Sequence, residues 1–291
     1  MKKLKLSMRA RYFMEGYSFI SLWLIGFLMF MAIPLGRSMY YSFHALKVSK
    51  DGLIATFVGM DHFRAAFTTD VNFLPLLKET MVSTLTQVPL ILIFSLFCAI
   101  LLNRGMIGKT FFRGVFFLPV IIASGAILSK LMDQGAANLP IFYNQNLYNK
   151  LSAFIPGDIL ETLLKSAESL TLVMWDSGVQ ILIFLAGLQT ISISLYEAAK
   201  CDGATAWESF WKITFPMIMP MMLVNTLFSI VSSFTKADNQ IMSHILNVVF
   251  KNNDFGYGSA MGWIYFVFIF LILGVVFLLF RKSLSATEGR K

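Results

Sequence analysis

The chain has 291 residues, of which 57% are hydrophobic and only 14% are charged, and its mean hydropathy is +0.70. A soluble domain carries about 25% charged residues, so this composition excludes an ordinary soluble protein and indicates an integral membrane protein. The net charge of +8 does not indicate nucleic-acid binding, because no basic patch is interleaved with base-stacking aromatic residues.

Six apolar segments are long enough for the roughly 20 residues that a membrane-spanning helix needs. They are continuously apolar, whereas the strands of a membrane barrel alternate in polarity over about ten residues. We therefore expect an all-α membrane protein with six transmembrane helices. The expected spans are residues 17–35, 80–102, 111–131, 170–189, 216–234 and 260–280.

The distribution of lysine and arginine predicts the orientation, because these residues gather on the cytoplasmic side of a membrane. If the N-terminus is inside, the inner segments hold 14 basic residues in 64 positions and the outer segments hold 10 in 108. We therefore expect two cytoplasmic termini, residues 1–16 and 281–291, around one membrane domain of residues 17–280. The first apolar run is too long for a cleaved signal peptide and is expected to remain as an anchor.

Two of the expected spans carry polar side chains, which are costly in hydrocarbon and usually face a cavity. The candidate set comprises Trp175, Asp176, Val179 and Gln180 in the fourth span, Asn225, Ser229, Ser232, Ser233 and Lys236 in the fifth, and Asp238 just after it. The members in the fifth span recur at helical spacing on one face. We expect this set to line a substrate path. The alternative is that the serines only mediate helix contacts and that Asp176 lies at the water interface.

Residues 190–215 form a polar connection between these two spans, on the expected cytoplasmic side. Residues 195–201 and 204–213 favour helix, and Gly203 between them can supply the positive φ that ends a helix. Pro216 is expected to end the loop and begin the next span. We expect two short helices that meet at Gly203. These properties alone leave open whether the loop binds another protein or only seals the end of the helix bundle.

This loop resembles the EAA loop of binding-protein-dependent ABC transporter permeases, whose pattern is EAA, then DGA, a spaced hydrophobic residue and I-x-LP. The matching residues are Glu197, Ala198 and Ala199, then Asp202, Gly203 and Ala204, and then Phe210, Ile213 and Pro216, with Phe215 in place of the usual leucine. The resemblance extends to residues 57–67 (FVGMDHFRAAF), which we expect along the outer membrane interface. Residues 101–124 look like the sugar-type permeases, so the resemblance covers nearly the whole chain.

The resemblance implies the fold of a type I ABC importer permease. In this family the EAA hairpin is the coupling helix that enters a cleft on a cytoplasmic ATPase, where Glu197 would pair with basic residues. The chain has no GxxxxGK[ST] phosphate loop, so the resemblance implies that the ATPase binds ATP and Mg²⁺. This chain itself is expected to carry no catalytic residue, cofactor or metal. The implied partners are a second permease, two ATP-binding subunits and an extracytoplasmic solute-binding protein, in a bacterial cell membrane.

The resemblance also implies a carbohydrate substrate, because the fourth and fifth spans line the cavity in similar sugar permeases. Trp175, Asp176 and Asp238 supply the aromatic face and hydroxyl-pairing groups that a sugar site needs. Residues 235–242 are similar to the branch linked with oligosaccharides from plant polysaccharides. Lys236 near the outer mouth keeps an acidic sugar open as an alternative.

Two other classes of protein are weighed against this interpretation. An ion-coupled secondary transporter usually has internal repeats and acidic residues near the midplane, but these central spans are poor in charge and no strong repeat is found. A membrane enzyme needs a catalytic cluster, but the three histidines are far apart in sequence and show no HExxH spacing. The secondary transporter is kept as the alternative.

Overall fold

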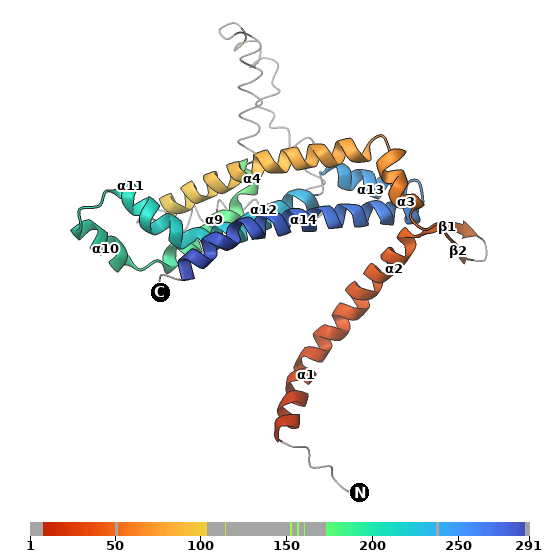
Figure 1. The fold of residues 1–291 in the computed structure, drawn as a ribbon, viewed down its shortest axis with the longest axis horizontal. Coiled ribbons are helices and arrows are strands. Elements are labelled where there is room, and N and C mark those ends of the chain that lie inside the picture. Colours follow the sequence, from red (N-terminus) through yellow and green to blue (C-terminus); the bar gives the residue numbers. More distant parts are fainter. Residues whose placement is uncertain are drawn as a thin grey trace. The chain divides into compact units, whose positions relative to one another are not determined.

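The computed structural model of the chain describes residues 8–49, 52–103, 173–236 and 239–288, and the single residues 114, 152, 156 and 160. The chain divides into two compact units. The first comprises Met1–Leu77 and Gln240–Phe268, and the second comprises Lys78–Asn239 and Ile269–Lys291. Two long helices, α4 (Phe73–Asn103) and α14 (Phe255–Glu288), contribute residues to both units (Figure 1).

The first unit begins with a long apolar helix that leads into a β-hairpin (Figure 1). α1 (Met8–Phe27), a π-helical turn at Leu28–Ala32 and α2 (Ile33–Ser42) follow one another directly. β1 (His44–Ser49) then pairs antiparallel with β2 (Gly52–Phe57). The strands mix polar residues with β-branched ones, which suits a half-buried pleated surface. The all-helical prediction therefore holds for the apolar spans that the structure describes, but the connection after the first span contains a hairpin that the sequence analysis did not expect.

Three further helical segments complete the described part of the first unit. They are α3 (Asp61–Thr68), α13 (Gln240–Phe250) and the first part of α14. Their fully buried apolar residues are Ala66, Ile241, Ala260 and Met261, and Phe73 at the start of α4 is also fully buried in this unit. α3 forms the second half of the segment 57–67 that was expected to be amphipathic, and it buries Ala66.

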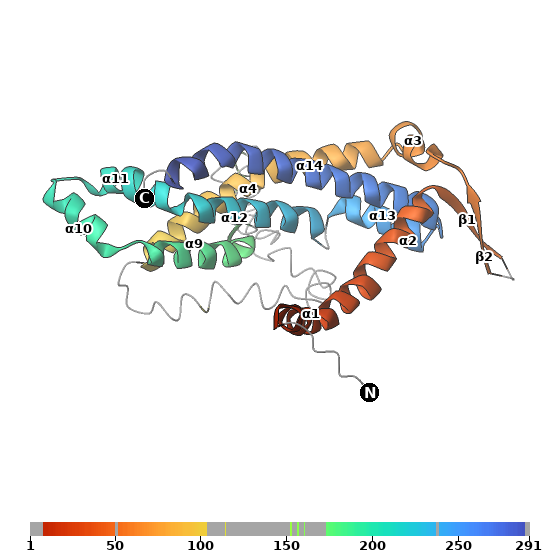
Figure 2. The ribbon, with the colours of Figure 1, turned by 60° about the horizontal axis from the view of Figure 1, so that its bottom comes forward.

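The second unit has a core shared by α4, α9 (Gly178–Thr190) and α12 (Phe215–Thr235), which lie side by side in Figures 1 and 2. Leu96, Phe184 and Ile218 are among the buried residues that join the three helices. Gly187 allows α9 and α12 to approach closely, because a Cβ at this position would lie 2.5 Å from Cγ of Met221.

Four helices of the described residues are long and apolar enough to cross a membrane, or five if the bent pair α9 and α10 (Ile193–Cys201) forms one span. Five of the six predicted spans coincide with described helices. The third predicted span, residues 111–131, lies outside the described residues except for residue 114. In the fourth, residues 173–176 are helical and a turn at Ser177 precedes α9, and the chain bends by 63° between α9 and α10.

α12 begins at Phe215 with Pro216 in its first turn, as predicted for the start of the fifth span, but no break separates it from the loop. α11 (Ala206–Ser209), a π-helical turn at Phe210–Thr214 and α12 form one helix of 30 residues, Ala206–Thr235. Pro216 lies within it, directly after the π turn. Proline lacks an N–H group and its ring clashes with the carbonyl of the preceding turn, and the wider π turn relieves this conflict. Pro34 follows the π turn between α1 and α2 in the same way.

Candidate functional site

Polar side chains from α4, α9 and α12 meet in the second unit. We call this set the polar seam; it comprises Thr84, Asp176, Gln180, Asn225, Ser229, Ser233 and Lys236. Gln180 Nε2 donates to Ser229 Oγ at 2.9 Å, and Asn225 Nδ2 donates to the backbone oxygen of Gln180 at 3.2 Å. The hydroxyl groups of Thr84 and Ser233 form a hydrogen bond, with their oxygens 2.8 Å apart. The seam therefore connects all three helices through side-chain hydrogen bonds.

An ion pair lies at one end of the polar seam. The ammonium group of Lys236, just after α12, donates to the Oδ2 carboxylate oxygen of Asp176, just before α9. Both side chains are partly buried. The pair therefore ties together the adjacent ends of the two helices that carry most of the seam.

Two amide oxygens of the seam are buried without a hydrogen-bond partner. Gln180 is 2% exposed and Asn225 is 0% exposed, and Oε1 of the first and Oδ1 of the second accept no bond. Buried polar atoms are nearly always paired, so such atoms need a donor from water or from a ligand. The cavity at the seam has a volume of about 10 Å³, which is room for about one water molecule. The structure therefore shows the seam closed around groups that still need donors.

The structure brings together most of the residues predicted for the substrate path. Ser232 also lines the small cavity. Trp175 and Val179 do not line it, although they lie next to residues that do. Asp238 lies outside the described residues. Sequence analysis missed Thr84 and Gln87 on α4, although two polar residues inside an apolar span were a usable signal.

The predicted loop is a helical hairpin that projects from one end of the second unit (Figures 1 and 2). α10 ends at Cys201 with Asp202 as its C-cap, and Gly203 has φ of +75°, which confirms the predicted conformation. The N–H of Gly203 donates to Lys200 O, and the N–H of Ala204 donates to Ala199 O. This double closure is the Schellman motif, which requires a left-handed residue at the position of Gly203. The sequence DGA thus folds as a helix stop.

The second arm of the hairpin begins with a capping box. The Thr205 hydroxyl accepts the N–H of Glu208, and the Glu208 carboxylate accepts the N–H of Thr205. Together these two bonds pair two backbone N–H groups that the start of a helix would otherwise leave without a partner. The pattern T-x-x-E was visible in the sequence and was overlooked. Only Ala204 therefore separates Gly203, which ends the first arm, from Thr205, which caps the second arm. This short spacing fixes the turn of the hairpin.

The hairpin presents polar and aromatic groups outward and rests on the core with its base. Glu197, Ala198 and Asp202 are exposed, and Trp207 is 69% exposed. Phe210 and Tyr196 pack against the core cluster of α4, α9 and α12. The Tyr196 and Thr214 hydroxyl oxygens lie 2.8 Å apart and join the two arms.

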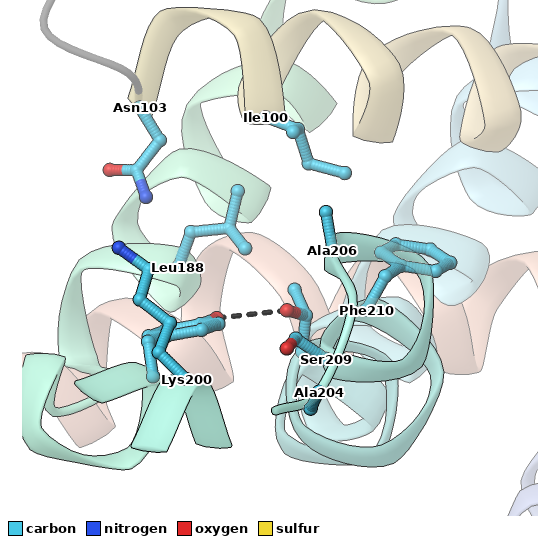
Figure 3. A pocket seen from close by; sticks show the side chains of 10 residues that line it. Ile100, Asn103, Leu188, Lys200, Ala204, Ala206, Ser209 and Phe210 are labelled. Carbon is cyan, nitrogen blue, oxygen red and sulfur yellow. Dashed lines mark hydrogen bonds between the residues drawn. The ribbon is translucent and has the colours of Figure 1, made fainter. Parts of the chain in front are cut away.

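A cavity of about 330 Å³ lies at the base of the hairpin. In Figure 3, Asn103 and Lys200 line one side of it, and Ala206 and Phe210 line the other. It extends from the end of α4 to the first turns of the second arm. The hairpin is thus attached to the core through Phe210 and Tyr196 and has open space beside these contacts.

A separate cluster of polar side chains, around Asp70 in the first unit, was not predicted from the sequence. Oδ2 of Asp70 accepts from His244 Nε2 at 2.9 Å and from the Tyr257 hydroxyl at 3.0 Å. Oδ1 accepts the N–H groups of Asn72 and Phe73 at the start of α4. Burial raises the pKa of Asp70, but these four hydrogen bonds outweigh it and lower the pKa below the usual value. Asp70 therefore joins α13 and α14 to the start of α4.

These arrangements belong to a helical membrane protein with a polar seam between its helices and a protruding polar hairpin. Residues 72–286 match the family of binding-protein-dependent transport system inner membrane components, and the chain belongs to this family. The predicted resemblance to this family of permeases is confirmed.

Individual relatives cover nearly the whole chain. Probable ABC transporter permease protein YesP of Bacillus subtilis (strain 168) is 35% identical, over 91% of this chain and 89% of its own length. The multiple sugar-binding transport system permease protein MsmF of Streptococcus mutans is 28% identical, over 90% and 92%. The arabinooligosaccharides transport system permease protein AraP of Halalkalibacterium halodurans is 24% identical, over 88% and 84%.

A solved structure shows the same fold. It is a bacterial alginate ABC transporter in complex with a periplasmic protein that holds an alginate pentasaccharide. One of its chains aligns with a TM-score of 0.64 and 18% identity, over 94% of this chain and 96% of that one. This likeness supports the predicted permease fold.

Proposed function

We propose that the chain is the transmembrane permease subunit of an ATP-driven ABC importer for carbohydrate, with an oligosaccharide as substrate. The observation that carries this proposal is the hairpin in a chain of this family, with its EAA residues on α10 and its DGA residues in the turn. The names of MsmF and AraP, which refer to sugars and arabinooligosaccharides, support the substrate class. A plant-polysaccharide origin of the oligosaccharide remains part of the proposal.

The hairpin is the proposed contact with the ATPase. Exposed Glu197 and Asp202 offer negative charge to a basic cleft, and exposed Trp207 offers a large aromatic surface. ATP and Mg²⁺ are then bound by two separate ATP-binding subunits. The chain itself acts as a non-catalytic part that binds no cofactor.

Movement of the hairpin can reach the polar seam along a continuous helix. The arm that begins at Ala206 runs without interruption to Thr235, and α12 within this helix carries Asn225, Ser229 and Ser233. Phe210 packs against the core near the base of the hairpin. The hairpin would therefore rotate about this contact and would not move independently of the core. A rotation imposed on the hairpin would therefore change the contacts of α12 with α9 and α4 and open the seam.

The remaining parts of the proposal concern assembly and orientation. The apolar helices and the family place the chain in a membrane, and we propose a bacterial cell membrane with both termini in the cytoplasm. The chain forms half of the pore, and a second, different permease forms the other half. A solute-binding protein delivers the sugar from outside, as the alginate complex illustrates for its own transporter.

Transport by the reconstituted complex tests the proposal. The chain, its partner permease and the ATPase are placed in proteoliposomes together with the binding protein, and uptake of labelled oligosaccharides is measured. Uptake should require ATP and the binding protein and should be unaffected by an imposed ion gradient. Uptake by the chain alone under an ion gradient would instead establish the secondary transporter.

A further inference from the structure

The charge of the polar seam determines which sugars it can accept, and this inference rests on the proposed function. Among the described residues that line the seam cavity, the only charged side chains are Asp176 and Lys236, and they pair with each other. The positive charge of Lys236, which alone would favour an acidic sugar, is therefore already neutralised. The lining presents no net charge to a bound molecule.

The other polar groups of the seam are suited to uncharged hydroxyl groups. Gln180 Oε1 and Asn225 Oδ1 are buried acceptors that lack a donor, and the hydroxyl of Ser229 is engaged by Gln180. A sugar hydroxyl can donate to an amide oxygen and accept from an amide or hydroxyl donor. An ionised carboxylate can only accept, so that group of an acidic sugar could not donate to either amide oxygen.

We propose that the polar seam selects uncharged saccharides, and that Asp176 determines this specificity by neutralising Lys236. A uronate entering the seam would have to displace Asp176 from Lys236 and leave a partly buried carboxylate without its partner. Breaking a buried pair in this way is strongly unfavourable. The ion pair therefore acts as a charge filter, and the amide and hydroxyl groups of the seam contact the neutral sugar.

The test compares one saccharide in two charge states. Trigalacturonate and its fully methyl-esterified form have the same sugar rings but differ in charge. Their dissociation constants are measured on the assembled membrane complex of both permeases and the ATPase, without the binding protein, so that the discrimination belongs to the membrane part. Carbohydrate uptake by the wild-type complex is measured separately. If that complex takes up no carbohydrate, the proposed function itself is contradicted.

The expected result is a reversal of preference that follows the charge. Wild type should favour the ester, and Asp176→Asn should bind the acid about tenfold more tightly than wild type does, which corresponds to about 1.4 kcal/mol. Lys236→Met in the Asp176→Asn background should restore the wild-type preference. The double variant that exchanges the pair, Asp176→Lys with Lys236→Asp, should also keep the wild-type preference for the ester. This double variant serves as the test if Asp176→Asn does not fold.

Two outcomes would overturn the charge filter while leaving the proposed function intact. The first is a complex that takes up carbohydrate but in which Asp176→Asn does not gain affinity for the acid. The second is a wild-type complex that binds the acid as tightly as the ester. If the ion pair had a purely structural role, Asp176→Asn would lose equal affinity for the acid and for the ester, without a change in preference.

Discussion

At the scale of single residues, the DGA sequence has a direct stereochemical explanation. Asp202 is the C-cap of α10, Gly203 adopts the left-handed conformation and Ala204 donates back to Ala199, so each position has a role in closing the helix. A Cβ at Gly203 would meet nothing within 4 Å. The requirement for glycine inside this chain is therefore conformational and not steric.

Gly203→Asp should leave membrane insertion intact and abolish uptake. The positive φ costs a side chain about 1 kcal/mol, which a folded domain tolerates, while the new carboxylate would enter the proposed contact with the ATPase. Expression level, copurification of the ATPase and uptake are measured together. Gly262→Ala is the control, because Gly262 also has open space around it but no positive φ, and it should behave as wild type. Loss of expression in Gly203→Asp alone would point to a folding role.

Asp70 makes the stability of the first unit depend on pH. Its hydrogen bonds form to the charged carboxylate, so their contribution is present above the usual pKa of 3.8 and is lost as the pH falls through the lowered pKa. Asp70→Asn should lower the unfolding temperature at pH 7, with a loss of about 1–3 kcal/mol, and should weaken its dependence on pH below 3.8. Thermal unfolding in detergent measures this, with exposed Asp61→Asn as the control. An unchanged temperature at pH 7 would contradict the role of Asp70.

At the scale of elements, the long apolar helices were predictable because their composition alone fixes them. The two arms of the hairpin were also predictable, since Gly203 separates two helix-favouring runs. The β-hairpin was missed because short mixed-polarity segments carry a weak signal beside long apolar spans. The continuity of the helix through Pro216 was missed because sequence alone does not reveal the preceding π turn.

The polar seam was predictable only in part. Helical spacing correctly grouped Ser229, Ser233 and Lys236 on one face, and these residues also make the helix contacts that were kept as the alternative. Their partners were not predictable from spacing. The contacts of Thr84 with Ser233 and of Asp176 with Lys236 depend on how separate helices pack, and residues 149 and 60 positions apart become neighbours.

Cysteine labelling should show that α12 has a face that opens to water during transport. In a background without Cys98 and Cys201, single cysteines at Ser229, Ser232, Ser233 and Lys236 should react with a small water-soluble thiol reagent. Because the seam is closed here, labelling of Ser229 should rise when ATP and loaded binding protein are added. Cysteines at Leu227 and Ile230 should react less. Equal labelling around the helix, or none at the serines in any state, would identify the stripe as a packing seam.

At the scale of the whole molecule, the proposed importer needs parts from other chains. The sequence has no GxxxxGK[ST] phosphate loop, and the described residues hold four helices that could cross a membrane, or five if the bent pair is one span. Within the described residues, no group of three or more histidine, cysteine or acidic side chains is placed to hold a metal ion. Among the described residues of the second unit, the polar hairpin projects beyond the apolar helices (Figure 2), which is why we propose it as the contact with the ATPase.

Glu197→Lys should weaken the association of the chain with the ATPase. Glu197 is exposed on α10 and makes no hydrogen bond or ion pair with another residue that the structure describes, so folding should be preserved. In the proposed complex, however, the new lysine would face the basic cleft that Glu197 is expected to meet. Like charges across an interface cost several kcal/mol, so copurification of the ATPase and ATP-dependent uptake should both fall by tenfold or more, roughly.

The matched control for this experiment is Glu79→Lys, which reverses an equally exposed charge on α4, far from the hairpin in sequence. It should retain both the ATPase and uptake. Restoration of binding to Glu197→Lys by a lysine-to-glutamate change in the ATPase cleft would locate the contact. If Glu197→Lys instead copurifies with the ATPase and transports as wild type does, Glu197 has no part in coupling, and the exposed aromatic residues of the second arm, Trp207 and Trp211, become the next positions to test.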